Sequence, residues 1–163
     1  MLLNWLPALA AVLVIAMEST ATMSGENTSR WLLPFWVKLF GAVSPRRWEE
    51  IHFLIRKTGH FVGYGLVSLA FYHGWRRSLP SWHQQGVWSA RLRAAAFAVF
   101  CTLVVASADE FHQSFLPGRT SSAYDVCLDV CGALVAHLML FAVLKLLWRG
   151  SGFRSNPDGP RWA

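Results

Sequence analysis

Charged residues, cysteines and signatures of familiar catalytic sites are all scarce in this chain. Only 15% of its 163 residues are charged, well below the ~25% that is usual in soluble domains. The three cysteines are too few for a disulfide framework, and none stands in a Cys-x-x-Cys pair. The sequence also has no His-Glu-x-x-His motif and no Gly-x-Ser-x-Gly motif. These shortages argue against a soluble globular domain, a zincin-type metal site and a serine-hydrolase nucleophile elbow.

Acidic residues are few as well, with nine Asp and Glu against fifteen Lys and Arg and a formal net charge of +6. A basic balance of this kind can indicate nucleic-acid binding. Here the Lys and Arg residues gather next to apolar runs, where they are more simply topology signals and contacts with anionic lipids. We therefore expect membrane lipids, and no nucleic acid, as partners.

The chain has four long apolar stretches instead, which cover residues 2–17, 51–75, 94–108 and 123–148. A membrane-spanning helix needs about 20 predominantly apolar residues. The pattern predicts an all-α, polytopic membrane helical bundle with about four transmembrane helices in residues 1–150, followed by a disordered tail at 151–163. The first stretch could also be a signal peptide, but no basic region precedes it, so we expect a retained span.

A shorter apolar segment, residues 30–43, lies between the first two stretches and is too short to cross a bilayer. Arg30, Pro34 and Lys38 recur at every fourth position beside several aromatic residues. Because such aromatics favour the headgroup region, we predict a short interfacial helix. An ordinary amphipathic helix packed over the bundle is the alternative.

The distribution of positive residues predicts the orientation. With four spans, residues 76–93 and the C-terminus share one side, which contains eight Lys and Arg. The other side keeps three, namely Arg46, Arg47 and Arg56, once the cations of the polar cluster and of the interfacial helix are set aside. The positive-inside rule then places both termini in the cytoplasm.

Polar side chains interrupt the apolar sequence at several places that the fold can bring together. Lys57, His60 and Tyr64 fall on one face of the second predicted span. Asp109 and Gln113 are one helical turn apart near the end of the third span. Polar groups at membrane depth are costly, so this arrangement calls for a structural or functional reason.

Three more features accompany these residues. Glu110 points about 100° away from Asp109 on the same helix, and Arg119 follows the Pro117-Gly118 turn. Ser122-x-x-Asp125 has the spacing of a capping box, which predicts the start of the fourth span. Asp125, Asp129 and Gly132 then share a stripe that must face other helices, since Asp against lipid costs about 3 kcal/mol.

Glycines on the second predicted span suggest where another helix packs. Gly59, Gly63 and Gly65 would allow a close approach, and Gly59-x-x-x-Gly63 matches a known packing motif.

Four sequence blocks together resemble the VanZ-like family. They are Arg-Lys-x-x-His-Phe-x-x-Tyr at 56–64, Asp-Glu-x-x-Gln at 109–113, Pro-Gly-Arg at 117–119 and Asp-x-x-x-Asp-x-x-Gly at 125–132. The resemblance implies a small multi-pass protein of the bacterial inner (cytoplasmic) membrane, in a family whose founding member is associated with reduced susceptibility to teicoplanin. Many relatives carry an acid where this chain has Gly63.

Three functions fit these residues. In the first, an outward-facing site binds an anionic lipid headgroup, a lipid-linked cell-wall precursor or a lipoglycopeptide, because an Arg fork suits phosphate and carboxylate. In the second, an intramembrane hydrolase or transferase acts on a lipid with His60, Asp109 and Glu110 as catalytic candidates. In the third, the polar residues only clasp helices together.

No metal or other cofactor is expected, because tight ligand spacing is missing from the sequence. The residues predicted to line the binding site are Lys57, His60, Tyr64, Asp109, Glu110, Gln113, Arg119 and Asp125.

Overall fold

A computed structural model describes residues 2–79, 86–117, 119 and 121–152 of the chain. These residues form helices, turns and short connections and contain no strand, which confirms the all-α prediction. Of the predicted tail at 151–163, residues 153–163 lie outside the described residues. The elements in chain order are η1 (Leu2–Trp5), α1 (Leu6–Glu18), η2 (Ala21–Met23), α2 (Gly25–Phe40), α3 (Pro45–Ser78), α4 (Val87–Gln113) and α5 (Ala123–Gly152).

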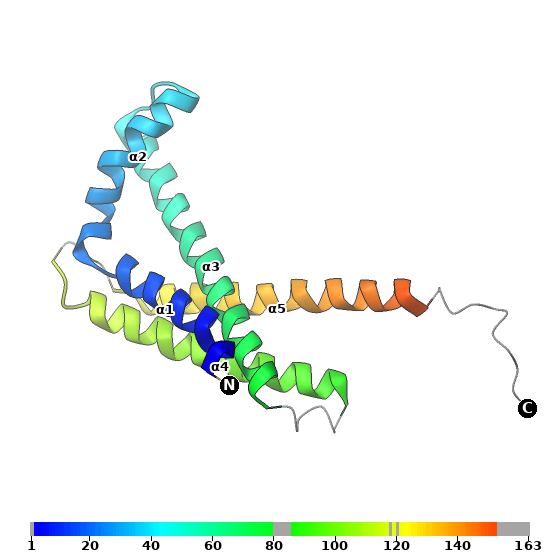
Figure 1. The fold of residues 1–163 in the computed structure, drawn as a ribbon. Coiled ribbons are helices and arrows are strands. Elements are labelled where there is room, and N and C mark those ends of the chain that lie inside the picture. Colours follow the sequence, from blue (N-terminus) through cyan, green and yellow to red (C-terminus); the bar gives the residue numbers. More distant parts are fainter. Residues whose placement is uncertain (1, 80–85, 118, 120, 153–163) are drawn as a thin grey trace, which may run out of the picture.

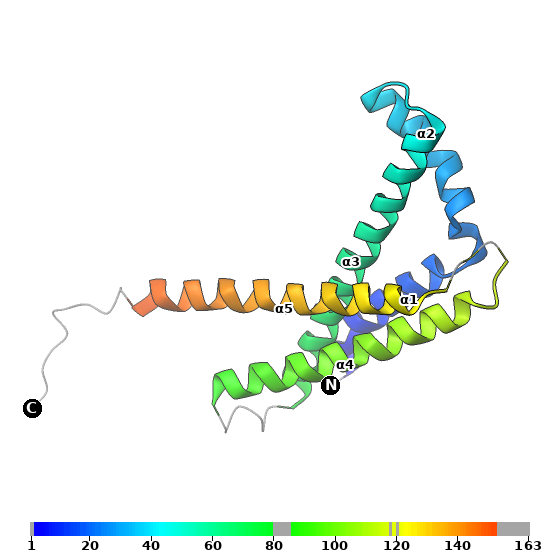
Figure 2. The same cartoon turned by 180° about the vertical axis from the view of Figure 1, so that it is seen from behind.

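The helices α1, α3, α4 and α5 alternate in direction (Figures 1 and 2). At one end of the bundle Trp5 donates from Nε1 to Ser78 Oγ at 2.8 Å, which joins the start of the chain to the end of α3. Trp88 and Trp148 stack at the same end, with ring centroids 5.7 Å apart. The start of the chain therefore lies beside the end of α3, and the start of α4 lies near the end of α5.

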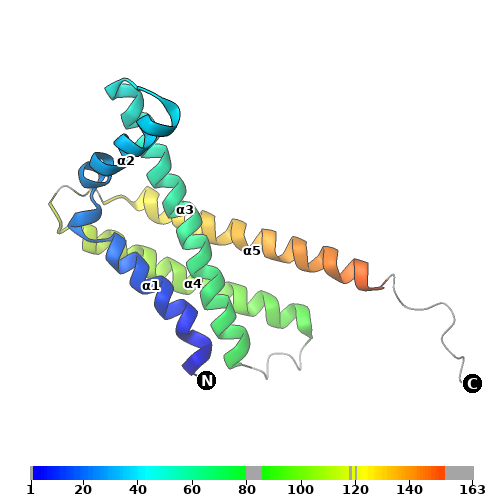
Figure 3. The same ribbon diagram turned by 45° about the horizontal axis from the view of Figure 1, so that its top comes forward.

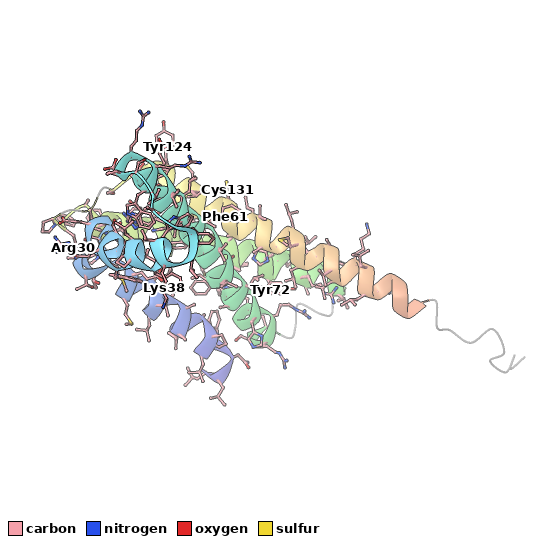
Figure 4. All side chains as sticks on the ribbon, turned by 90° about the horizontal axis from the view of Figure 1, so that it is seen from above. Arg30, Lys38, Phe61, Tyr72, Tyr124 and Cys131 are labelled. Carbon is pink, nitrogen blue, oxygen red and sulfur yellow. The ribbon has the colours of Figure 1, made fainter. Side chains whose placement is uncertain are left out.

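The central element is α3, which packs against α1, α4 and α5 (Figure 3). Its crossing with α5 is closest at Gly132, where an added Cβ would overlap the backbone carbonyl of Phe61. Phe61 and Cys131 are labelled near this crossing in Figure 4. Gly65 also faces Gly132, because a Cβ added to it would lie 3.1 Å from the Gly132 carbonyl oxygen. By contrast, a Cβ on Gly59 or Gly63 would meet nothing within 4 Å among the described residues, so within this part of the chain no helix packs against the Gly59-x-x-x-Gly63 motif.

The inner face of α4 consists of small residues spaced four apart. Ala90, Ala94, Ala98 and Ala106 are all buried, together with Thr102. Small side chains allow helices to approach closely, and here they pack against α3 and α5. The same face continues into Asp109 and Gln113, so the packing that forms the core also carries these polar groups inward.

By length and composition, two helices are apolar enough to cross a membrane, namely α4 and the part of α5 from Ala123 to Trp148. The prediction of four spans is not confirmed. The helix α1 has only 13 residues, or about 20 Å at 1.5 Å per residue. The helix α3 is longer, with 34 residues, but His60, Tyr64 and several glycines lower its hydropathy. A helix enclosed by three neighbours can carry such residues, because they face protein instead of lipid.

The predicted interfacial helix corresponds to α2, which starts at Gly25 instead of residue 30. Ser24 caps it by accepting a hydrogen bond from the Asn27 N–H at 3.4 Å. None of its residues is buried, and in Figures 1 and 2 it rises beside the first turns of α3, away from the other helices. Trp48 of α3 reaches it with a 2.6 Å hydrogen bond to Ser29 Oγ. Arg30 and Lys38 mark the course of α2 in Figure 4.

Candidate functional site

The eight side chains predicted for the site line two small cavities at the end of the bundle where α4 ends and α5 begins. The cavities adjoin, since His60 and Gln113 belong to both. The larger has a volume of about 250 Å³, and the smaller, about 10 Å³, is close to the space that one water needs. The larger contains Lys57, Glu110 and Asp125, and the smaller contains Tyr64, Asp109 and Arg119.

Asp109 is a buried acceptor on α4, with 8% of its surface exposed. Its Oδ2 accepts a hydrogen bond from Tyr64 Oη at 2.9 Å and another from Gln113 Nε2 at 2.8 Å. The second bond confirms that residues 109 and 113 share a face. Its Oδ1 is buried and has no hydrogen-bond partner among the described residues, so this oxygen can accept a further donor.

Glu110, which lies on α4, caps the N-terminus of α5. Its Oε2 accepts a 2.8 Å hydrogen bond from the backbone N–H of Ser122, while Ser122 Oγ accepts one from the Tyr124 N–H at 3.2 Å. The capping box predicted within Ser122-x-x-Asp125 is therefore split between two helices, with Glu110 in the role expected of Asp125. This change leaves Asp125 available to form an ion pair with Lys57, which links α3 to α5.

His60 pairs with a residue that the predicted site set does not include. Its Nδ1 lies 3.5 Å from Oδ1 of Asp129, whose side chain is fully buried. Neither carboxylate oxygen of Asp129 has a hydrogen-bond partner in the described part of the chain. The sequence does indicate Asp129, because it is an acid in the middle of an apolar run, one helical turn after Asp125.

The guanidinium of Arg119 donates hydrogen bonds to two backbone carbonyls. Nη1 donates to the Met23 carbonyl at 2.8 Å and Nη2 donates to the Glu18 carbonyl at 3.0 Å. Burial and the neighbouring Arg56 lower the pKa of the Arg119 guanidinium, which nevertheless stays protonated at physiological pH. The side chain thereby ties the α4–α5 connection to the end of α1, where unpaired carbonyls attract cations.

Arg56 is the second residue that the predicted site set omits. It makes no hydrogen bond or ion pair with any residue that the structure describes, although it lines the larger polar cavity. Its guanidinium lies against the first residue of α2, since a Cβ on Gly25 would collide with Arg56 Nη1. Backbone N–H groups at a helix start and a guanidinium both attract anions. In the sequence, Arg56 could have been recognised as a candidate because it stands directly before Lys57, a predicted site residue.

Two histidines outside the cluster have structural contacts. His137 shares a 3.0 Å hydrogen bond with Ser68 and is buried, so it is a packed group. His52 lies 3.1 Å from Thr28 Oγ1 and stacks on Trp48. Among the described residues, no group of three or more His, Cys, Asp and Glu has an arrangement suited to a metal ion.

A family model described as VanZ/LLP1 matches residues 4–146, which is most of the chain. Neither the curated proteins nor the solved structures gave a match.

Proposed function

The chain belongs to the VanZ/LLP1 family, and from the geometry of its polar cluster we propose that it binds the phosphate group of an anionic membrane lipid. The family and the two apolar helices indicate a membrane protein. In this proposal it is a multi-pass protein of the bacterial inner membrane with both termini in the cytoplasm, so the cluster faces outward.

The observation that carries the proposal is the guanidinium of Arg56, which has no hydrogen-bond or ion-pair partner among the described residues. The other cations of the cluster are already engaged, Lys57 with Asp125 and Arg119 with two backbone carbonyls. Arg56 stands beside the larger polar cavity and the start of α2. A phosphate can accept two parallel hydrogen bonds from such a fork. His60 and Lys57 line the same cavity and would face the same group.

A lipid is the favoured source of that phosphate because the cavity lies among helices built for an apolar environment. Phospholipids and lipid-linked cell-wall precursors both present phosphate at the membrane surface. By binding either ligand, this protein would affect the cell envelope and thereby the susceptibility of the cell to glycopeptides such as teicoplanin.

Lipid binding by the purified protein tests the proposal. In nanodiscs, the wild-type chain should retain dioleoylphosphatidylglycerol in preference to dioleoylphosphatidylcholine, as measured by native mass spectrometry. Arg56→Gln should lower the affinity for the anionic lipid about tenfold, equivalent to about 1.4 kcal/mol. The matched control is Arg46→Gln on the same helix, whose side chain is 92% exposed and lies 3.7 Å from Glu50.

A second variant tests whether the position of the Arg56 guanidinium matters, and not only its positive charge. Gly25→Ala keeps Arg56 but forces its guanidinium away from the start of α2. It should weaken binding of the anionic lipid, though less than Arg56→Gln does. Unchanged preference for the anionic lipid in Arg56→Gln would refute the proposal.

Acid–base chemistry on a lipid is a second candidate, and the His60–Asp129 pair favours it. A buried carboxylate beside an imidazole can orient the ring as a general base. Of the catalytic candidates named from sequence, Asp109 and Glu110 already accept hydrogen bonds from neighbouring groups. If the chain is a lipid hydrolase or transferase, His60→Gln and Asp129→Asn should abolish turnover of a labelled phospholipid while the protein stays folded. Turnover in both variants would exclude this role.

A further inference from the structure

A larger groove opens between α1, α2 and α3, with a volume of about 530 Å³. Arg56 and His60 line it as well as the larger polar cavity, so the two spaces meet at these side chains. The groove is therefore the apolar extension of the site that the proposed function describes.

The groove is polar at one end and apolar along the rest of its length. Its lining on α3 runs from Arg56 at the polar end to Leu66 and Val67, a distance of about 15 Å for ten residues at 1.5 Å each. The opposite wall on α1 runs the other way, from Val14 up to Glu18, next to which Arg119 is bound. Both walls thus change from polar to apolar in the same direction, as the headgroup and chain of a lipid do.

Two glycines keep the floor of the groove open. Gly59 and Gly63 line it, and a Cβ on either would meet nothing within 4 Å. Glycine within a helix is destabilising relative to alanine, and here no helix of the described chain fills the space that the glycines leave. At Gly132, by contrast, the missing side chain is required by the close contact with Phe61.

We propose that this groove holds one hydrocarbon chain of the anionic phospholipid whose phosphate binds at Arg56. The inference rests on the proposed function and specifies its ligand as a complete phospholipid. Charge complementarity fixes the direction of the bound lipid, with the phosphate at Arg56 and the chain running toward Leu66. Van der Waals packing of the chain along the groove adds to the affinity that the phosphate contact supplies.

Filling the groove tests this assignment. Gly63→Leu extends an isobutyl group into the groove from a Cβ that would meet no described atom within 4 Å. The control is Thr58→Leu, an exposed position on the same helix that lines none of the cavities described above. Binding of dioleoylphosphatidylglycerol and of water-soluble glycerol phosphate is measured for both variants, for the wild type and for Arg56→Gln.

We expect Gly63→Leu to lower the affinity for dioleoylphosphatidylglycerol at least fivefold and to leave glycerol phosphate binding unchanged, whereas Thr58→Leu changes neither. A dioleoyl lipid with a diazirine near the end of its chain should crosslink to the region of Leu66 in the wild type and lose that product in Gly63→Leu. Arg56→Gln should weaken both phosphate ligands.

The two proposals fail in different ways. If Gly63→Leu binds the lipid as tightly as the wild type while Arg56→Gln does not, the groove assignment is wrong and the phosphate site stands. If Gly63→Leu changes the oligomeric state in nanodiscs instead of lipid affinity, a protein helix and not a lipid chain occupies the groove. If Arg56→Gln binds normally, the phosphate site itself is refuted.

Discussion

His60 Nδ1 lies 3.5 Å from Oδ1 of Asp129, a carboxylate with no exposed surface on a helix otherwise suited to lipid. An acid in such a place is costly unless a partner compensates it. The pair therefore links the exposed part of the polar cluster to the interior of the α3–α5 contact.

Removal of this carboxylate should destabilise the bundle. Asp129→Ala removes the carboxylate that lies 3.5 Å from His60 Nδ1, and we expect the free energy of unfolding to fall by about 1–3 kcal/mol, the usual cost of an unsatisfied buried group. Asp129→Asn keeps an oxygen at nearly the same place and should cost less. Denaturant unfolding in detergent measures both, and equal losses would show that the lost negative charge, not the lost oxygen or its volume, causes the effect.

The closest helix crossing should tolerate no side chain at Gly132. Gly132→Ala brings a Cβ against the Phe61 carbonyl, so α3 and α5 must separate and the yield of folded protein should drop sharply. Gly63→Ala is the matched control, because its Cβ meets nothing and alanine favours a helix over glycine by about 0.5–1 kcal/mol. Thermal unfolding compares them, and similar midpoints for the two variants would contradict the observed packing.

Arg119 should behave as a structural residue. Arg119→Lys cannot donate to the Met23 and Glu18 carbonyls at once in the way the fork does, so we expect a lower unfolding temperature. Affinity for anionic lipid, expressed per folded molecule, should stay within about twofold of the wild type, unlike that of Arg56→Gln. A variant with normal stability and lost lipid binding would instead make Arg119 a ligand, as the sequence suggested.

The ion pair between Lys57 and Asp125 should show measurable coupling. Lys57→Met and Asp125→Asn each remove one partner, and the double variant should be more stable than the sum of the single losses predicts. Coupling between polar groups on membrane helices averages about 0.6 kcal/mol and reaches about 1.7. A double-mutant cycle on the unfolding free energy gives the value, and strict additivity would mean that the pair does not contribute.

Orientation can be decided by thiol labelling. In a background without Cys101, Cys127 and Cys131, Ser121→Cys should react with an impermeant reagent outside intact cells. Val87→Cys at the other end of α4 should react only after permeabilisation. The opposite pattern would reverse the proposed topology, and reaction of both positions from outside would mean that α4 does not cross the membrane.

The sequence by itself determined the helical class, the start of the last helix and most members of the polar cluster. Apolar runs of helical length mark α4 and α5 directly, since composition decides which segments can cross lipid. The spacing of Asp109 and Gln113 also fixes their common face, because helix geometry is local.

Only the tertiary structure decided how those residues are paired. Distances between helices select Asp129 for His60, Asp125 for Lys57 and the Ser122 backbone for Glu110. They also engage Arg119 with carbonyls and leave Arg56 without a partner in the part of the chain that the structure describes. A sequence states which charges are present near the end of a bundle. Which of them are already satisfied depends on contacts between residues far apart in the chain, and that decides which remain available to a ligand.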